Sequence, residues 1–361
     1  MLRVVVHTPD VVGERMAGPG IRAWHFADEL SKHFHIALVA RLEGKPPARV
    51  PFALLARGSN EAKRALHDAD VLLGQPARGF RRLRKTQRIV YDLFDPVLLE
   101  LREMYGRSPS LRQRVHLAAE KSRLKTALKE GDLLLVAAPK QRELYKRKNI
   151  IEVPFGAEVA ESREPRAESL ILWGGGIWEW LDPKTAVEAT VKLNRDGVPC
   201  RLLFLGRSRP NRSMIDRRRE DRFDRLVASG DPFVQANDEW VPYRERLSWL
   251  HRAKIAIMLH RPTAEAEYSI RTRLFDAIAA AVPVITTEEG FAAELVRAEG
   301  LGVVVPPGDV DAVTEAMRKL LCDDAFHARC VTNLARIRPR FAWDVVTRPL
   351  IDAIQRWKHD D

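Results

Sequence analysis

Residues 169–185, SLILWGGGIWEWLDPKT, form the clearest strand–loop–helix unit of the chain. The segment 169–173 is apolar enough for a buried strand, and Gly174, Gly175 and Gly176 follow it directly. Asp182 then supplies a helix N-cap, with a proline at the first helical position. A short buried strand that ends in glycine and leads into a helix is typical of a parallel α/β sheet.

The same alternation of short apolar segments and amphipathic helical patterns continues in both halves of the 361-residue chain. Because this length exceeds what one hydrophobic core usually serves, we expect two domains. Both should be Rossmann-like, doubly wound parallel-sheet domains of the α/β class, facing each other across a cleft. The segments expected to be strands are 3–7, 35–40, 71–73, 88–91, 133–137 and 151–153, then 169–173, 201–205, 233–235, 254–259, 283–286 and 302–305.

A charged segment with almost no apolar residues, 158–169, predicts the linker between the domains. We therefore expect a first domain over residues 1–158 and a second over residues 169–340. An amphipathic pattern over 343–357 predicts a C-terminal helix beyond the last strand.

The charge of the chain is unevenly distributed. Residues 1–158 carry 29 Lys and Arg against 18 Asp and Glu, a net +11 that equals the charge of the whole chain. This asymmetry predicts a polyanionic partner for the first domain: an anionic membrane surface, a phosphorylated substrate or nucleic acid. The alternative is a solvated basic face without a partner.

Two absences from the sequence bear on location and cofactors. No apolar run reaches the roughly 18–20 residues that a membrane span needs, and the first residues read as a strand and lack the pattern of a signal peptide. Cys200, Cys322 and Cys330 are widely spaced, which argues against a disulfide framework or a zinc site. We therefore expect a cytoplasmic protein.

Two glycine-rich loops are candidates for binding phosphate or sugar. Gly18 and Gly20 precede a helix, and the three glycines 174–176 lie between a strand and a helix. Glycine lets backbone N–H groups approach an anion, and a helix N-terminus adds partial positive charge. The alternative at each loop is a turn with only a structural role.

The segment 260–276, HRPTAEAEYSIRTRLFD, lies between a buried strand and an alanine-rich helix. Arg271 and Arg273, near the N-terminus of that helix, can clamp a diphosphate. Asp276 can accept hydrogen bonds from a ribose diol, and Glu267 can contact a sugar ring. The alternative is that the two arginines pair with acidic neighbours, namely Glu265, Glu267 or Asp276.

Two carboxylates, Asp92 and Asp95, follow a strand of the first domain. Either could hydrogen-bond an acceptor hydroxyl or act as its base. The alternative for Asp95 is that it caps the helix starting at Pro96.

Several segments together resemble glycosyltransferase family 4, whose members have the GT-B fold, use nucleotide sugars, retain the configuration of the sugar and need no metal. The similar segments, which together span nearly all of the chain, are Gly18-Pro19-Gly20-Ile21-Arg22, 153–158 (VPFGAE), 241–253 (VPYRERLSWLHRA), 275–285 (FDAIAAAVPVI), 302–309 (GVVVPPGD) and 341–343 (FAW). Their family counterparts include the first Gly-rich loop, the exit from the first domain and the "L-E-A-M-A-A-G-x-P-V-V" helix and strand. The last segment resembles the start of a helix that returns to pack on the first domain.

The resemblance also implies roles for single residues. The acidic pair of the family falls on Tyr268 and Asp276, so the second acid, which binds ribose, survives, while the first is replaced and Glu267 stands beside it. The Arg and Lys that bind diphosphate in the family fall on Gly175 and Leu181. We expect their charge to come from Arg271 or Arg273, with Lys184. A family histidine of the first domain is replaced by the Asp92 and Asp95 pair.

These inferences predict a retaining glycosyltransferase that moves a sugar from a nucleotide-diphosphate sugar to a hydroxyl of a surface glycan or glycolipid, without a metal or other cofactor. The predicted catalytic residues are Glu267, Asp92 and Asp95. The predicted donor-binding residues are Gly18, Gly20, Gly174, Gly175, Gly176, Lys184, Gly206, Val241, Tyr268, Ser269, Arg271, Thr272, Arg273 and Asp276.

The predicted partners are a nucleotide sugar and a glycan or lipid-linked acceptor, with the basic first domain meeting an anionic membrane at its cytoplasmic face and no nucleic acid. One alternative is a catalytically silent paralogue of the same fold that binds a polyanion. The other is a dinucleotide-dependent oxidoreductase, which needs a Gly loop directly after its strand.

Overall fold

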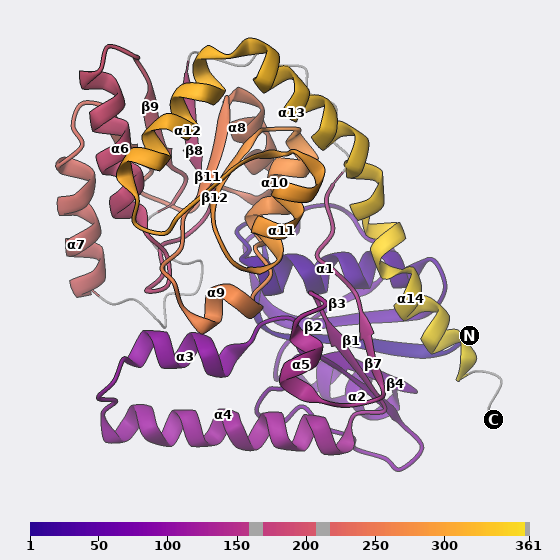
Figure 1. Ribbon diagram of the computed structural model, residues 1–361. Coiled ribbons are helices and arrows are strands. Elements are labelled where there is room, and N and C mark those ends of the chain that lie inside the picture. The colour runs from indigo at the N-terminus through magenta and orange to yellow at the C-terminus, as the bar shows by residue number, and fades with distance from the viewer. Residues whose placement is uncertain (159–168, 207–216, 358–361) are drawn as a thin grey trace. The chain divides into compact units, whose positions relative to one another are not determined.

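The computed structural model describes residues 1–158, 169–206 and 217–357 (Figure 1). The chain divides into two compact units. Unit 1 contains Met1–Gly156, Tyr268–Ile270 and Trp343–Asp361, and unit 2 contains Ala157–Glu267 and Arg271–Ala342. The predicted linker over 158–169 lies outside the described residues, apart from its two end positions.

Unit 1 is built on a sheet of seven strands in the order β3-β2-β1-β4-β5-β6-β7, and every neighbouring pair is parallel. Central strands such as β4 and β6 are buried along their whole length, as the apolar runs of a sheet covered on both faces require. The strands are β1 (Arg3–Gly13), β2 (His35–Glu43), β3 (Ala53–Ala56), β4 (Val71–Gly74), β5 (Arg88–Asp92), β6 (Leu133–Val136) and β7 (Ile150–Glu152).

Strand β1 is longer than predicted. It was expected to end at His7, but it continues to Gly13 after a shift of register. His7 lies opposite Val39 and Val11 opposite Arg41, so three residues of β1 face a single residue of β2 between these pairs. The sequence Thr-Pro-Asp within this bulge interrupts the apolar pattern. For this reason the sequence predicts a loop where the second half of the strand lies.

The helices of unit 1 are α1 (Gly18–Ser31), α2 (Asn60–Asp68), α3 (Val97–Tyr105), α4 (Leu111–Glu130), α5 (Gln141–Tyr145) and α14 (Trp343–Arg356). Helix α14 packs on α1, where the Trp343 ring stacks on His25 with 4.4 Å between centroids. A Cβ atom at Gly156 would lie 2.2 Å from that indole, so this position accepts only glycine.

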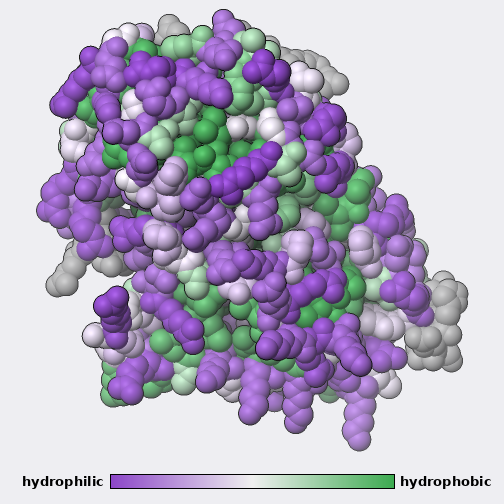
Figure 2. Space-filling view, viewed as in Figure 1, coloured by the Kyte–Doolittle hydropathy of each residue, from purple (hydrophilic) through white to green (hydrophobic). Residues whose placement is uncertain are grey.

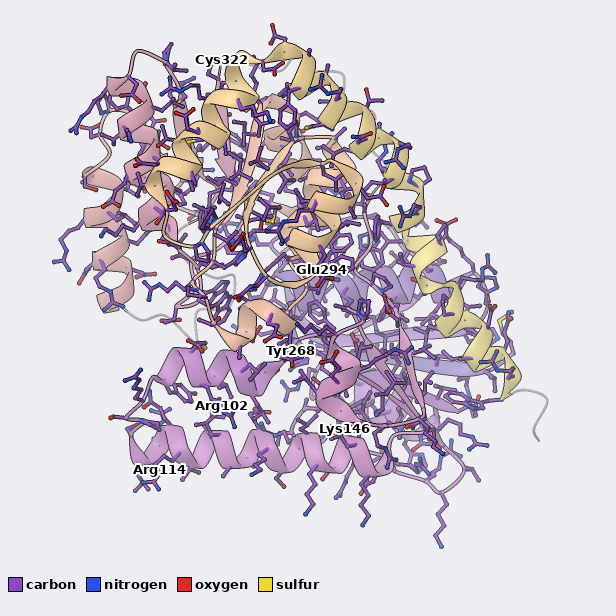
Figure 3. The ribbon with its side chains drawn as sticks, viewed as in Figure 1. Arg102, Arg114, Lys146, Tyr268, Glu294 and Cys322 are labelled. Carbon is purple, nitrogen blue, oxygen red and sulfur yellow. The ribbon has the colours of Figure 1, made fainter. Side chains whose placement is uncertain are left out.

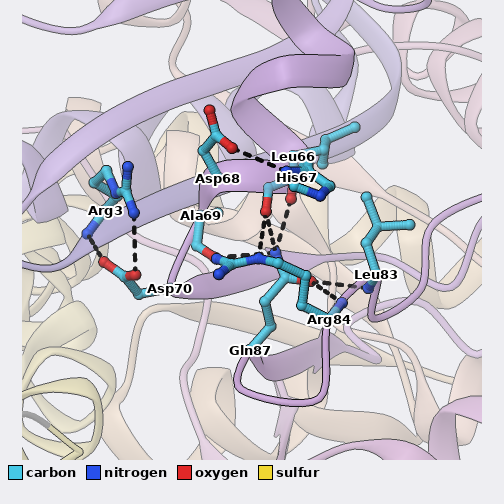
Figure 4. A network of polar contacts seen from close by, with 9 residues as sticks. All are labelled: Arg3, Leu66, His67, Asp68, Ala69, Asp70, Leu83, Arg84 and Gln87. Atoms are coloured by element: carbon cyan, nitrogen blue, oxygen red, sulfur yellow. Dashed lines mark hydrogen bonds and ion pairs between the residues drawn. The ribbon is translucent and has the colours of Figure 1, made fainter.

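The segment between β4 and β5 is held by a buried amide (Figure 4). Gln87 is 1% exposed, and its Oε1 accepts from the backbone N–H groups of Leu83 and Arg84. Its Nε2 donates to three carbonyl groups at the end of α2. Arg84 donates to two of these carbonyls, and Arg82 bonds Asp132, so part of the basic charge of this segment is used structurally.

Unit 2 is built on a sheet of six strands in the order β10-β9-β8-β11-β12-β13, again with every neighbouring pair parallel. The strands are β8 (Leu170–Trp173), β9 (Arg201–Phe204), β10 (Val234–Ala236), β11 (Ile255–Met258), β12 (Val284–Thr287) and β13 (Gly302–Val305). The prediction of two doubly wound parallel sheets is confirmed.

Two groups of helices flank this second sheet (Figure 1). Helix α6 packs with α7 and α12, whereas α10 packs with α8 and α13. The helices are α6 (Pro183–Arg195), α7 (Arg217–Ala228), α8 (Arg246–Arg252), α9 (Ala264–Tyr268), α10 (Thr272–Ala280), α11 (Gly290–Glu299), α12 (Val310–Cys322) and α13 (Asp324–Ile337). No helix within the described ranges is both long enough and apolar enough to cross a membrane.

Candidate functional site

Two predicted motifs, almost a hundred residues apart in sequence, meet at the carboxyl end of β8. The side chain of Arg273, in the first turn of α10, donates a hydrogen bond to the backbone oxygen of Gly176. A Cβ atom at Gly175, whose φ is +86°, would lie only 3.2 Å from Arg273 Nε. The guanidinium therefore lies in the space that a side chain at position 175 would fill.

Arg273 carries a charge that no neighbouring carboxylate neutralises directly. Its guanidinium lies over the ring of the buried Trp173, 5.4 Å from the centroid, and within the described ranges it forms no ion pair. Burial and the nearby charge of Arg271 lower its pKa to about 9, with Glu265 and Asp276 acting in the opposite direction, so the group is still protonated at neutral pH. A mostly buried cation without a counter-ion is electrostatically suited to bind an anion.

The neighbouring arginine has a different environment. Both Nη atoms of Arg271 donate to Glu265, at 2.7 Å each, and the Glu265 side chain is 1% exposed. This bidentate pair joins α9 to the residue preceding α10 and neutralises Arg271. The alternative prediction, that an arginine pairs with an acidic neighbour, therefore holds for Arg271. Arg273 is the arginine that remains available to contact an anion.

Asp276, one turn further along α10, lies beside a cation that the sequence did not predict. Its Oδ1 accepts from Arg246 Nε at 3.0 Å, and Arg246 Nη2 lies 3.3 Å from Glu158. The Arg246 guanidinium covers the Tyr243 ring at 3.8 Å, and the Tyr243 hydroxyl donates to Glu158. The only signal for this group was an arginine three residues after Val-Pro-Tyr, and sequence alone gave it no partner.

The Asp276 carboxylate keeps one oxygen available. Burial raises its pKa, and the charge and hydrogen bond of Arg246 partly offset that rise. Within the described residues, its Oδ2 accepts no hydrogen bond, and the side chain is 25% exposed. Arg246 thus fixes one oxygen and leaves the other able to accept from a hydroxyl group.

Other predicted donor-binding residues lie as follows. Lys184 extends into solvent from the first turn of α6, 71% exposed, with its Nζ 3.5 Å from Glu188. Gly206 follows β9, and Val241 lies shortly before α8. Thr272 is the first residue of α10, Glu267 and Tyr268 end α9, and Ser269 is buried.

The glycines of the first loop belong to unit 1, where Gly18 and Gly20 form the first turn of α1. A Cβ atom at Gly20 would lie 2.1 Å from the carbonyl oxygen of Val11. Close packing of α1 on β1 is therefore a sufficient reason for glycine at this position.

Asp92 is the partner of a buried arginine. Its two oxygens accept from Arg22 Nε at 2.8 Å and from Nη2 at 3.0 Å, and the Arg22 side chain is 1% exposed. The ion pair engages both carboxylate oxygens, which supports a structural role for Asp92 in unit 1, and its catalytic role stays a prediction. The predicted cap at Asp95 is absent, because Pro96 is the N-cap of α3 and no side chain caps that helix.

No group of three or more His, Cys, Asp and Glu side chains in the described part of the chain is arranged to hold a metal ion. Two buried histidines, His7 within β1 and His260 just after β11, are neutral. Burial holds the pKa of His7 at about 4 and that of His260 well below its usual range, and the charges of Arg271 and Arg273 act in the same direction on His260.

The chain is similar to known glycosyltransferases. Residues 168–323 match the family model for glycosyl transferases group 1. Sucrose-phosphate synthase from Thermosynechococcus elongatus superposes with a TM-score of 0.73 over 100% of both chains, at 16% identity. HepE from Anabaena, in complex with UDP-glucose, gives 0.72 over 99% of this chain and 100% of its own, at 10% identity.

A third solved structure is WaaG, a glycosyltransferase involved in lipopolysaccharide biosynthesis. It has a TM-score of 0.70 at 15% identity and covers 97% of this chain and 99% of its own. A search of curated protein sequences finds no significant match. The prediction of a GT-B fold is thus confirmed, and residues 168–323 of the chain match the glycosyl transferases group 1 family.

Proposed function

We propose that the chain transfers a sugar, with retention of configuration, from a nucleotide-diphosphate sugar to a hydroxyl of a surface glycan or glycolipid. The observation that carries the donor assignment is the uncompensated charge of Arg273. That charge lies against the glycine loop 174–176, after a strand of a parallel sheet and in the first turn of α10. Such a combination of fixed cation, accessible backbone and helix N-terminus suits a diphosphate.

The solved structures similar to this chain support the same donor class. HepE is seen with UDP-glucose, with UDP and glucose, and with UDP alone. WaaG acts in lipopolysaccharide biosynthesis, which supports an acceptor of the surface-glycan or glycolipid type. The resemblance to family 4 supports the proposals of retention and of independence from metals.

In the proposed mechanism, charge that develops on the leaving diphosphate is stabilised by Arg273, by the backbone N–H groups of 174–176 and by the N-terminus of α10. Asp276 accepts a hydrogen bond from the ribose through Oδ2, while Arg246 keeps its carboxylate charged and oriented. Glu267 contacts the donor sugar. Arg273 and Asp276 are each held by a hydrogen bond to a neighbouring group, so they require little reorganisation during the reaction.

Thermal unfolding with a panel of ligands tests this proposal. We expect one of UDP, GDP, ADP or TDP to raise the melting temperature, because a ligand at 100 times its Kd stabilises the folded state by about 2.7 kcal/mol. The matching nucleotide sugar should then be hydrolysed slowly without acceptor. Stabilisation by NAD or NADP instead would support the oxidoreductase alternative, and stabilisation by none of these ligands would support the silent paralogue.

We also propose that unit 1 meets an anionic membrane through α3 and α4. Helix α4 has 20 residues, of which only Ala127 is buried, and it carries six Lys and Arg against two Glu. Leu111 and Val115, at its start, are 78% and 62% exposed. Figure 2 shows hydrophobic surface where α4 begins and long hydrophilic side chains along it, and Figure 3 labels Arg102 and Arg114 on the two helices.

Co-sedimentation with lipid vesicles tests the membrane contact. We expect binding to vesicles that contain phosphatidylglycerol and not to pure phosphatidylcholine, because each basic residue near an anionic surface contributes about 1 kcal/mol. The double variant Lys121→Ala/Lys125→Ala should bind about tenfold or more weakly. Lys184→Ala/Arg195→Ala, which removes two exposed cations of unit 2, is the matched control. Equal losses in both variants, or no binding by the unchanged protein, would contradict the proposal.

A further inference from the structure

Trp240, an aromatic side chain beside the glycine loop 174–176, has no role in the proposed mechanism. Trp240 lies between β10 and α8, and its six-membered ring packs against two glycines that follow neighbouring strands. A Cβ atom at Gly176 would lie 3.0 Å from Trp240 Cζ3, and one at Gly206 would lie 3.2 Å from Trp240 Cε3. Both distances are tighter than ordinary side-chain contacts, so glycine at these two positions makes room for the indole.

Among the tryptophans near the loop, Trp240 is the one best placed to receive a ligand. Trp173 is fully buried beneath the Arg273 guanidinium. Trp180 is 5% exposed and stacks on Trp178, with 5.5 Å between centroids and 8° between planes, so Trp178 has one face occupied. Trp240 remains partly exposed.

The indole and the free cation contact the same loop residue. Arg273 bonds the backbone oxygen of Gly176, and Trp240 packs where the side chain of Gly176 would be. A flat aromatic surface and a cation that both contact Gly176 match the two ends of a nucleoside diphosphate, which has a planar base and an anionic diphosphate. A base of any identity can stack on an aromatic ring, because every base has a π face.

We infer that Trp240 is the stacking platform for the nucleobase of the donor. This inference rests on the proposed nucleotide-sugar function and adds a residue that determines the affinity for the base. It also gives Gly176 and Gly206 a reason to lack side chains, since either Cβ would displace the ring.

Isothermal titration of purified variants tests this assignment, with a nucleoside diphosphate and inorganic pyrophosphate as probes. Trp240→Ala is expected to weaken binding of the preferred nucleoside diphosphate by about 5- to 150-fold, the range measured for base–aromatic stacking. Pyrophosphate has no base, so its affinity should not change. Trp240→Phe should keep the affinity within about threefold of the original, because a smaller ring still stacks.

Trp178→Ala is the matched control, since it removes a second partly exposed indole that lies near Gly176. Its nucleotide affinity should fall less than that of Trp240→Ala. If the original protein binds nucleoside diphosphates and Trp240→Ala binds them equally well, the stacking role of Trp240 is contradicted. The proposed donor site is not affected by that result. An equal loss of pyrophosphate affinity would also overturn it, because the ring would then act by shaping the loop. If the original protein binds no nucleoside diphosphate, both the proposed nucleotide-sugar function and the stacking role of Trp240 are contradicted.

Discussion

Replacing Arg273 with alanine should lower kcat/KM for sugar transfer by about 100- to 1,000-fold, the effect of removing one preorganised group that stabilises charge in a transition state. The reason is that Arg273 is the cation at the loop 174–176 that no carboxylate contacts in the described part of the chain. Steady-state kinetics with the preferred nucleotide sugar measure the loss. Titration with the nucleoside diphosphate separates weaker binding from slower chemistry.

The stability of the same variant distinguishes an anion site from a structural arginine. A cation held in a low-dielectric environment without a counter-ion costs free energy, so Arg273→Ala should melt at the same temperature as the original protein or higher. Added nucleoside diphosphate should stabilise the original protein much more than the variant.

Two further variants calibrate this experiment. Arg273→Lys keeps the charge but loses the planar fork, and intermediate activity is expected. Lys184→Ala should change kcat/KM less than twofold, because Lys184 extends into solvent and its nearest carboxylate belongs to Glu188. If Lys184→Ala lowered kcat/KM as much as Arg273→Ala does, Lys184 would be a diphosphate ligand. The assignment of Arg273 as the main cation for the diphosphate would then be contradicted.

The meeting of the glycine loop with Arg273 could be predicted from sequence because it follows from topology. The loop follows β8 and Arg273 lies beyond β11, and these strands are neighbours in the sheet. The carboxyl ends of neighbouring parallel strands meet at one edge, so polar residues after them are brought together whatever the details of packing. The hydrophobic periodicity of the sequence, together with its glycine and proline residues, was enough to predict both strands.

The choice of partner for each charge could not be predicted in this way. Arg271 pairs with Glu265, Asp276 with Arg246 and Asp92 with Arg22, and the last two pairs join residues 30 and 70 positions apart. Such pairs depend on side-chain length and burial. The hydrophobic periodicity and the turn residues of a sequence carry no information about either. For the same reason the sequence contains no sign of the pair at Asp92, because Arg22 lies on α1, 70 positions away.

The pair of Arg22 and Asp92 should dominate the stability of unit 1. Arg22 also donates to the carbonyl oxygens of Val153 and Pro154, and its guanidinium lies over two phenylalanine rings. Arg22→Met keeps the approximate volume but leaves a buried carboxylate and two carbonyl groups without donors. We expect it to lower the free energy of unfolding by about 3–5 kcal/mol, the usual result of breaking a buried pair from one side.

Native-state hydrogen exchange of peptides from β5 and β6 can measure this loss, because it reports the opening of unit 1 separately from unit 2. The double variant Arg22→Met/Asp92→Leu should recover much of the stability, since neither charge is then buried alone. The matched control is the exposed pair of Arg3 and Asp70 in the same unit, whose side chains are 57% and 35% exposed (Figure 4). Arg3→Ala should cost less than about 1 kcal/mol, because solvent screens the attraction. If Arg22→Met cost no more than Arg3→Ala, Asp92 would not depend on Arg22, and its carboxylate would again be a candidate to bind the acceptor.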